Sequence, residues 1–273
     1  MWRGVFEAVL FGVLEGVTEW LPVSSTGHLI LLERWLSPCF DEAFFSLFEV
    51  VIQLGAILAV VLLFFAPLWP FSGDKSRAER RDTWFLWGKI VLATLPAVIA
   101  GLLLEEWLDQ TLYNAPTVAA TLIFYGVLFL LLEKRQCPPR VSALSEIGVR
   151  DALLIGCFQV LSLVPGTSRS GATILGGRLL GVDRPAAAAF SFYLAIPVMA
   201  GASALKAVKF FAVGQMLSTK EWVWLLTGTL TAFLVSLVTI RFLMEFVRRR
   251  SFSAFGVYRI FLGAAVLLSL LIS

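Results

Sequence analysis

The sequence predicts an all-α polytopic membrane protein with an inverted-topology repeat, and three observations support this prediction. First, 59% of the 273 residues are hydrophobic and only 15% are charged, which excludes a soluble globular protein. Second, the charges are clustered, and six apolar stretches between them are long enough to span a bilayer. Third, two further apolar segments are interrupted in the middle by proline, glycine and hydroxyl residues.

The six apolar stretches are the predicted transmembrane helices. About 20 residues in an α-helix cross a hydrocarbon core of roughly 30 Å. Within the stretches Glu49, Lys89 and Arg259 are isolated charges, and the sequence lacks the strict alternation of barrel strands. The predicted spans cover residues 43–65, 84–104, 116–132, 185–208, 221–240 and 255–273.

The two interrupted segments predict re-entrant helix-loop-helix hairpins. Residues 5–36 are broken at Pro22-Val-Ser-Ser-Thr-Gly27, and residues 151–181 at Pro165-Gly-Thr-Ser-Arg-Ser-Gly171. Residues 151–163 would form a helix of only about 20 Å, which is too short to cross. Irregular backbone at membrane depth is tolerated where it is buried in protein or lines a wet cavity. An ordinary span kinked by proline is the alternative.

The hairpins also resemble each other in sequence. Residues 7–31 align without gaps on 151–175, at an offset of 144, with seven identities in 25 positions, including a glycine and a serine at each break. We therefore expect one integral membrane domain of two repeats, 1–135 and 150–273, each with one hairpin and three spans. Three spans per repeat would invert one half relative to the other, so that the hairpin tips meet near the midplane.

Charge and cysteine content give further expectations. The connections 66–83, 133–150 and 241–254 are rich in lysine and arginine, which places them on the cytoplasmic side and both termini outside. A net charge of +3 is too small and dispersed for a nucleic-acid surface. The spacing of Cys39, Cys137 and Cys157 fits neither a metal site nor a disulfide framework, so none is expected. Acidic residues interrupt the apolar N-terminal segment, so a cleaved signal peptide is not expected either.

The first hairpin tip carries acids, hydroxyls and the single histidine, His28. Glu15 and Glu19 are four apart and lie on one helical face. Two carboxylates at apolar depth require a proton, a basic partner or a cation. They could bind Mg²⁺ or Ca²⁺ that bridges to phosphate oxygens, or one of them could pair with Arg169. Ser25 and His28, one turn apart, are candidates for nucleophile and general base.

The second tip, Gly166-Thr-Ser-Arg-Ser-Gly171, leads into an apolar helix. A helix N-terminus offers free N–H groups, glycines admit an anion, and Arg169 can bind phosphate through two nitrogens. The tip therefore predicts a phosphate-binding site. For the serines, N-capping of the helix is the simpler alternative.

These motifs resemble those of the undecaprenyl-diphosphate phosphatases of the bacitracin-resistance type. The first hairpin contains a Glu/Gln-x-x-x-Glu motif, Glu15-Gly-Val-Thr-Glu19, followed by Pro-Val-Ser-Ser-Thr-Gly-His28. The second contains a P-G-x-S-R-S-x-x-T motif, Pro165-Gly-Thr-Ser-Arg-Ser-Gly-Ala-Thr173. The likeness extends to the first span through Phe48-Glu-Val-Val-Ile-Gln-Leu-Gly55. The resemblance implies hydrolysis of a C55 polyprenyl diphosphate in a bacterial inner membrane, a divalent cation such as Mg²⁺ or Ca²⁺, and bacitracin resistance. In such a membrane the outward termini predicted from the basic connections are periplasmic.

From the resemblance and the tip chemistry together we predict the site residues. The catalytic residues would be Glu15, Glu19, Ser25, His28 and Arg169, with both glutamates also binding metal; the substrate-binding residues would be Ser24, Thr26, Gly166, Thr167, Ser168, Ser170 and Thr173. The attacking group stays open among Ser25, His28 and water. The expected partners are the polyprenyl diphosphate and membrane lipid, with a homodimer as one candidate assembly. A polyprenyl-phosphate flippase is the alternative function.

Overall fold

The computed structural model describes residues 1–36, 39–134 and 138–271. Arg135 of the basic connection 133–150, Cys137 and the last two residues of the predicted span 255–273 lie outside these ranges. Over the described residues the chain folds into α-helices joined by short connections, with an isolated β-bridge between Val141 and Val182. The all-α prediction is therefore confirmed.

Six helices are long and apolar enough to cross a membrane, as predicted. They are α3 (Glu42–Leu63), α5 (Arg77–Leu112), α6 (Ala115–Lys134), α9 (Arg184–Ala212), α10 (Thr219–Arg249) and α11 (Ser253–Leu271). Many of their leucines, valines and phenylalanines face outward, for example Leu103, Val238 and Phe261, which are 69–77% exposed. An outer surface of this kind suits lipid and would aggregate in water.

Several of these helices are longer than the apolar stretches that predicted them. Helix α5 begins at Arg77 rather than at residue 84, and α10 continues to Arg249 rather than ending at residue 240. Ser76 and Glu79 form a capping box at the start of α5, and arginine is a good helix former. Hydropathy marks the part of a helix in hydrocarbon, and the charged ends extend beyond it.

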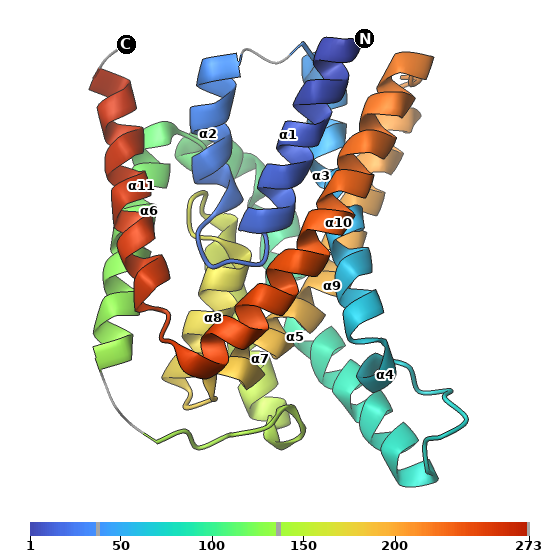
Figure 1. Cartoon of the computed structure of the whole chain (residues 1–273), viewed down its shortest axis with the longest axis vertical. Helices are drawn as coiled ribbons and strands as arrows, with labels where there is room; N and C mark the ends of the chain where they lie inside the picture. The colour runs from blue at the N-terminus through green and yellow to red at the C-terminus, as the bar shows by residue number, and fades with distance from the viewer. Residues whose placement is uncertain (37–38, 135–137, 272–273) are drawn as a thin grey trace.

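Two shorter helix pairs form the hairpins. Helices α1 (Trp2–Thr18) and α2 (Ser25–Leu36) make the first, and α7 (Val149–Val160) and α8 (Arg169–Leu179) make the second. The first break covers residues 19–24, earlier than predicted, because Ser25 already begins α2. The second break includes a 3-10 turn, Leu161–Leu163. In Figure 1 the hairpins enter from opposite ends of the molecule, with their turns near the middle.

Each hairpin packs on a long helix from the other half of the chain. Helix α1 packs along α10, and α7 packs along α5. Two glycines allow these close approaches: a Cβ on Gly12 would lie 2.6 Å from the Gly228 carbonyl oxygen, and one on Gly156 would lie 2.2 Å from that of Ala93. Gly12 and Gly156 align in the sequence repeat. These contacts agree with two related halves, whose inverted orientation stays a prediction.

Helices α3 with α9, and α6 with α11, complete the bundle around the two hairpins. Short helix α4 (Phe65–Leu68) and the connection after it lead from α3 to the projecting end of α5 (Figure 1). The main hydrophobic cluster contains Trp20 and Val23 of the first tip, Ile174 and Leu175 of α8, and Phe192 of α9. The bundle thus holds both hairpin turns inside an apolar core.

Candidate functional site between the hairpin tips

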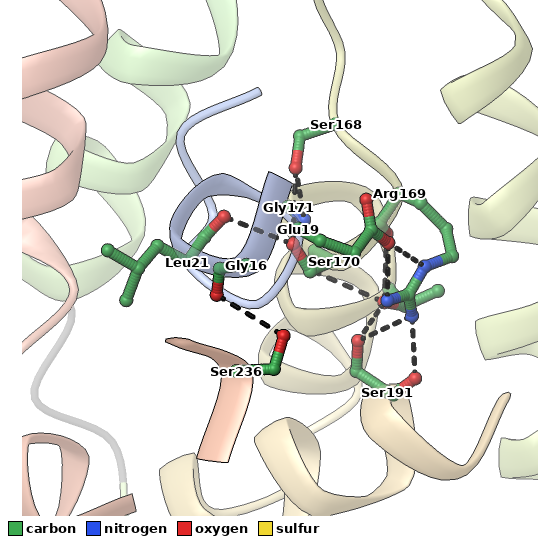
Figure 2. Close-up of polar contacts among 10 residues, drawn as sticks. Gly16, Glu19, Leu21, Ser168, Arg169, Ser170, Gly171, Ser191 and Ser236 are labelled. Carbon is green, nitrogen blue, oxygen red and sulfur yellow. Dashed lines mark hydrogen bonds and ion pairs between the residues drawn. The ribbon is translucent and has the colours of Figure 1, made fainter. Parts of the chain in front are cut away.

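The two hairpin tips are joined by an ion pair between residues 150 positions apart. Arg169, the first residue of α8, donates to Oε1 of Glu19 from Nε at 3.1 Å and from Nη2 at 2.9 Å. Both side chains are about 10% exposed. Glu19 follows the last residue of α1 and keeps a helical backbone, so it stays on the same face as Glu15. Figure 2 shows the guanidinium between this carboxylate and Ser191.

Arg169 is held from two further directions. Its Nη1 donates to the Ser191 carbonyl oxygen at 2.7 Å, and the guanidinium carbon lies 5.8 Å from the centre of the Trp20 ring. The hydroxyls of Ser191 and Thr173 are 2.7 Å apart. Thr173, predicted to bind substrate, is only 1% exposed. Its hydroxyl contacts the hydroxyl of Ser191, whose carbonyl oxygen accepts the hydrogen bond from Arg169. Ser191 gave no signal in the sequence.

Glu15 lies one turn before Glu19 and is only 4% exposed. Its Oε1 has no hydrogen-bond partner within the described chain, and Glu19, Glu49 and Arg169 are close enough to act on it electrostatically. A buried carboxylate oxygen without a donor is costly, so Glu15 requires a proton or a bound cation. Glu49 of α3, seen before only as an isolated charge in a span, therefore belongs to the surroundings of the site.

The two glutamates fit the divalent cation that the sequence predicted. Glu15 offers an unpartnered oxygen, and Arg169 occupies only Oε1 of Glu19. Among the described residues no three His, Cys, Asp or Glu side chains form a metal-binding group. Mg²⁺ in particular is often held by one or two carboxylates together with water and substrate phosphates. Glu15 and Glu19 are the residues that would hold such an ion, with water and substrate phosphates completing its coordination.

The serine hydroxyls around the start of α8 are engaged within the protein. Ser168 accepts from the N–H of Gly171 and so caps α8, which is the alternative considered for this serine. Ser170 donates to the carbonyl of Leu21 in the first tip. Gly166 has a φ of +85°, and a Cβ there would lie 2.2 Å from Thr121 Oγ1. Packing thus requires glycine at this position. Thr167 is 1% exposed.

The second group of predicted residues lies at the start of α2. His28 bonds through Nδ1 to the carbonyl of Ser24 and through Nε2 to the hydroxyl of Tyr258, both at 2.7 Å. Ser24 is buried, and Ser25 and Thr26 are partly exposed in the first turn of the helix. Both ring nitrogens of His28 are therefore engaged with groups other than Ser25, Glu19 and Arg169.

A second arginine, Arg259, holds the two tips together. It is fully buried on α11 and donates to the carbonyl of Pro22 at 3.2 Å, of Gly166 at 2.8 Å and of Thr167 at 3.0 Å. Pro22 belongs to the first tip and the other two to the second. The sequence showed this arginine as a lone charge in an apolar span, which by itself marks a functional or structural role. Its neighbour Tyr258 gave no such signal.

The fold and the site define a class: a polytopic membrane protein in which two hairpins bring acids, hydroxyls and arginine together inside the bundle. The family model for "Bacitracin resistance protein BacA" matches residues 8–265. The chain is similar to proteins named undecaprenyl-diphosphatase, with 47% identity to that of Enterococcus faecalis, covering 98% of both chains. Identity is 51% to that of Acetivibrio thermocellus, covering 97% of both. The chain belongs to the BacA family.

Proposed function

We propose that this protein hydrolyses undecaprenyl diphosphate to undecaprenyl phosphate and inorganic phosphate, which recycles the lipid carrier for peptidoglycan synthesis and confers resistance to bacitracin. The names of its relatives support the substrate. The observation that carries the proposal is the buried Glu19–Arg169 pair between the tips, with the unpartnered Glu15 one turn away. An arginine and two carboxylates with a cation are the groups that phosphoryl transfer requires.

In the proposed reaction Arg169 binds the diphosphate through two nitrogens. To do so it shares or releases the Glu19 oxygen that it now contacts, and the bond to the Ser191 carbonyl keeps the guanidinium in place. Glu15 and Glu19 would hold the divalent cation. When bound, a cation of this kind neutralises charge that develops on the phosphate oxygens. The N-terminal turn of α8, which begins at Arg169, adds backbone donors.

The attacking group stays open among Ser25, His28 and water. A carbonyl oxygen only accepts, so the proton of His28 lies on Nδ1, toward Ser24, and Nε2 is the basic atom. An attack by Ser25 with His28 as base would require the imidazole to leave Tyr258. Trapping a phosphorylated protein would support a covalent route. Full turnover in both Ser25→Ala and His28→Ala would exclude it and leave water.

The proposed location is the bacterial inner membrane, with both termini on the periplasmic side. The distribution of basic connections supports this orientation. Labelling of single cysteines placed near residue 1 and in connection 66–83, with a reagent that does not cross the membrane, tests it. A polyprenyl-phosphate flippase is the second candidate, because the hairpins enter from opposite ends (Figure 1).

Phosphate release from farnesyl diphosphate in detergent micelles separates the two functions. A micelle does not separate two aqueous compartments, so a flippase without phosphatase activity would release no phosphate. The proposed phosphatase would release phosphate in the same micelles. We expect activity to disappear on chelation with EDTA and to return with Mg²⁺ or Ca²⁺. Arg169→Ala should be inactive while remaining a folded, monodisperse protein. Undiminished phosphate release from Arg169→Ala would contradict the proposed site.

A further inference from the structure

The half-exposed Tyr258 of α11 is the side chain that meets the basic nitrogen of His28. Its hydroxyl lies 2.7 Å from Nε2, and the two rings are stacked with centres 5.6 Å apart and planes inclined by 14°. The histidine comes from the first hairpin and the tyrosine from the last transmembrane helix, 230 positions away. This contact is independent of the Glu19–Arg169 pair.

The hydrogen bonds of His28 fix its tautomer. The Ser24 carbonyl can only accept, so Nδ1 carries the proton in that bond. In the neutral ring Nε2 then has a lone pair, and the Tyr258 hydroxyl is the donor to it. Loss of either partner would free the ring to change tautomer or rotamer. The carbonyl and the phenol therefore act together on one imidazole.

Arg259 explains why Tyr258 is well placed for this role. It follows Tyr258 in the chain, is fully buried, and is fixed by carbonyls of both hairpin tips. This anchoring locks the turn of α11 that carries the tyrosine against the tips. Arg259 is also the charged group that acts electrostatically on His28. The tyrosine is 46% exposed, so the His28–Tyr258 pair is not sealed inside the bundle.

We propose that Tyr258 is a positioning residue for His28, because its hydroxyl and ring hold the imidazole as the Nδ1–H tautomer with the basic Nε2 toward α11. This inference rests on the proposed function, since it assumes that His28 takes part in hydrolysis. In this role Tyr258 does not contact the reacting phosphorus. The phenol stays neutral and orients the imidazole of His28. The lone pair on Nε2 becomes available when a substrate displaces the Tyr258 hydroxyl.

The first test is ¹⁵N NMR of protein labelled at histidine, in detergent. The chain has one histidine, so the imidazole resonances need no assignment. Above the histidine pKa, wild type should show a protonated Nδ1 and a bare, hydrogen-bonded Nε2. In Tyr258→Phe, which keeps the stacked ring, the Nε2 resonance should move toward that of a free pyridine-type nitrogen. An Nε2–H tautomer in wild type, or the same spectrum in both proteins, would overturn the proposal.

The second test is kinetic and uses phosphate release from farnesyl diphosphate. General acid–base groups contribute about 10²–10⁴-fold, and we expect Tyr258→Phe to lose part of this, about 10-fold in kcat, with KM within twofold. Tyr113→Phe, the same change at an exposed tyrosine after α5, is the matched control and should equal wild type. A wild-type kcat in Tyr258→Phe despite a changed NMR spectrum would show that the bond does not serve catalysis.

The two tests also separate this inference from the proposed function. If wild type releases no phosphate, the proposed hydrolysis fails, and the NMR result still decides whether Tyr258 sets the tautomer. If wild type is active and His28→Ala keeps full turnover, His28 is not catalytic and the positioning role is refuted. Reduced kcat in both His28→Ala and Tyr258→Phe, with the expected spectra, supports the proposal.

Discussion

Ser24 and Ser168 both adopt a left-handed backbone, with φ of 73° and 71°, and within the described chain they are the residues other than glycine that do so. They are 144 positions apart, the offset at which the two hairpin segments align. Each precedes the second helix of its hairpin. A positive φ at a residue other than glycine costs of order 1–3 kcal/mol, so its recurrence in both turns indicates that the surrounding packing imposes it.

Changes at Ser168 should separate the strain from the helix cap. Ser168→Ala keeps the strained backbone and loses the bond from the Gly171 N–H, so the free energy of unfolding should fall by about 1 kcal/mol. Ser168→Gly also loses the bond but relieves the strain, so it should be the more stable of the two variants. Reversible unfolding by SDS in mixed micelles measures both. The opposite order of stability would contradict a strained turn.

The close contact of α7 with α5 should tolerate no side chain at Gly156. Its Cβ would lie 2.2 Å from the Ala93 carbonyl oxygen, so Gly156→Ala should lower the free energy of unfolding by about 1–3 kcal/mol. Gly88 of α5 faces open space, and Gly88→Ala is the matched control. Alanine favours the helix there, so stability should be unchanged or should rise by up to about 1 kcal/mol. Equal losses in both variants would refute close packing at Gly156.

The helices, hairpins and charged residues of the tips could be predicted from the sequence because each leaves a local signal. Apolar length marks a span, and a proline–glycine break marks a hairpin. Pairing of Arg169 with one of the two glutamates was one of the alternatives, and Glu19 is the partner. The choice of Glu19 over Glu15 depends on the geometry of the turn after Thr18, which no local pattern encodes.

Other parts of the site have no signal in one sequence. From the sequence alone, a tyrosine in an apolar span that contacts a site residue, as Tyr258 does, cannot be distinguished from one that faces lipid. Ser191 is one small residue in a helix, and only the fold brings its carbonyl to Arg169. The first hairpin break also lies earlier than predicted, because Ser25, Thr26 and Gly27 form the first turn of α2 although their composition is typical of a loop.

Arg259 should be required for the two tips to stay together. Arg259→Met keeps the apolar stem and removes the donors to the Pro22, Gly166 and Thr167 carbonyls. A buried acceptor left without a donor costs about 1–3 kcal/mol, partly offset here because a buried charge is also removed. We expect the thermal unfolding midpoint and phosphate release both to fall. Full activity at wild-type stability would show that other contacts hold the tips.

Replacing Arg169 by lysine should impair catalysis much more than folding. Lysine keeps the charge but cannot bond Glu19 and the Ser191 carbonyl at once from a planar fork. We expect kcat/KM for farnesyl diphosphate to fall by roughly 10²-fold or more, as for loss of a group that stabilises charge in the transition state. Arg178→Lys is the matched control, because this arginine lies on the same helix and pairs with Glu133. Its kcat/KM should stay close to that of wild type. Equal losses in the two variants would mean that any arginine of α8 matters only for stability, and that the phosphates are bound elsewhere.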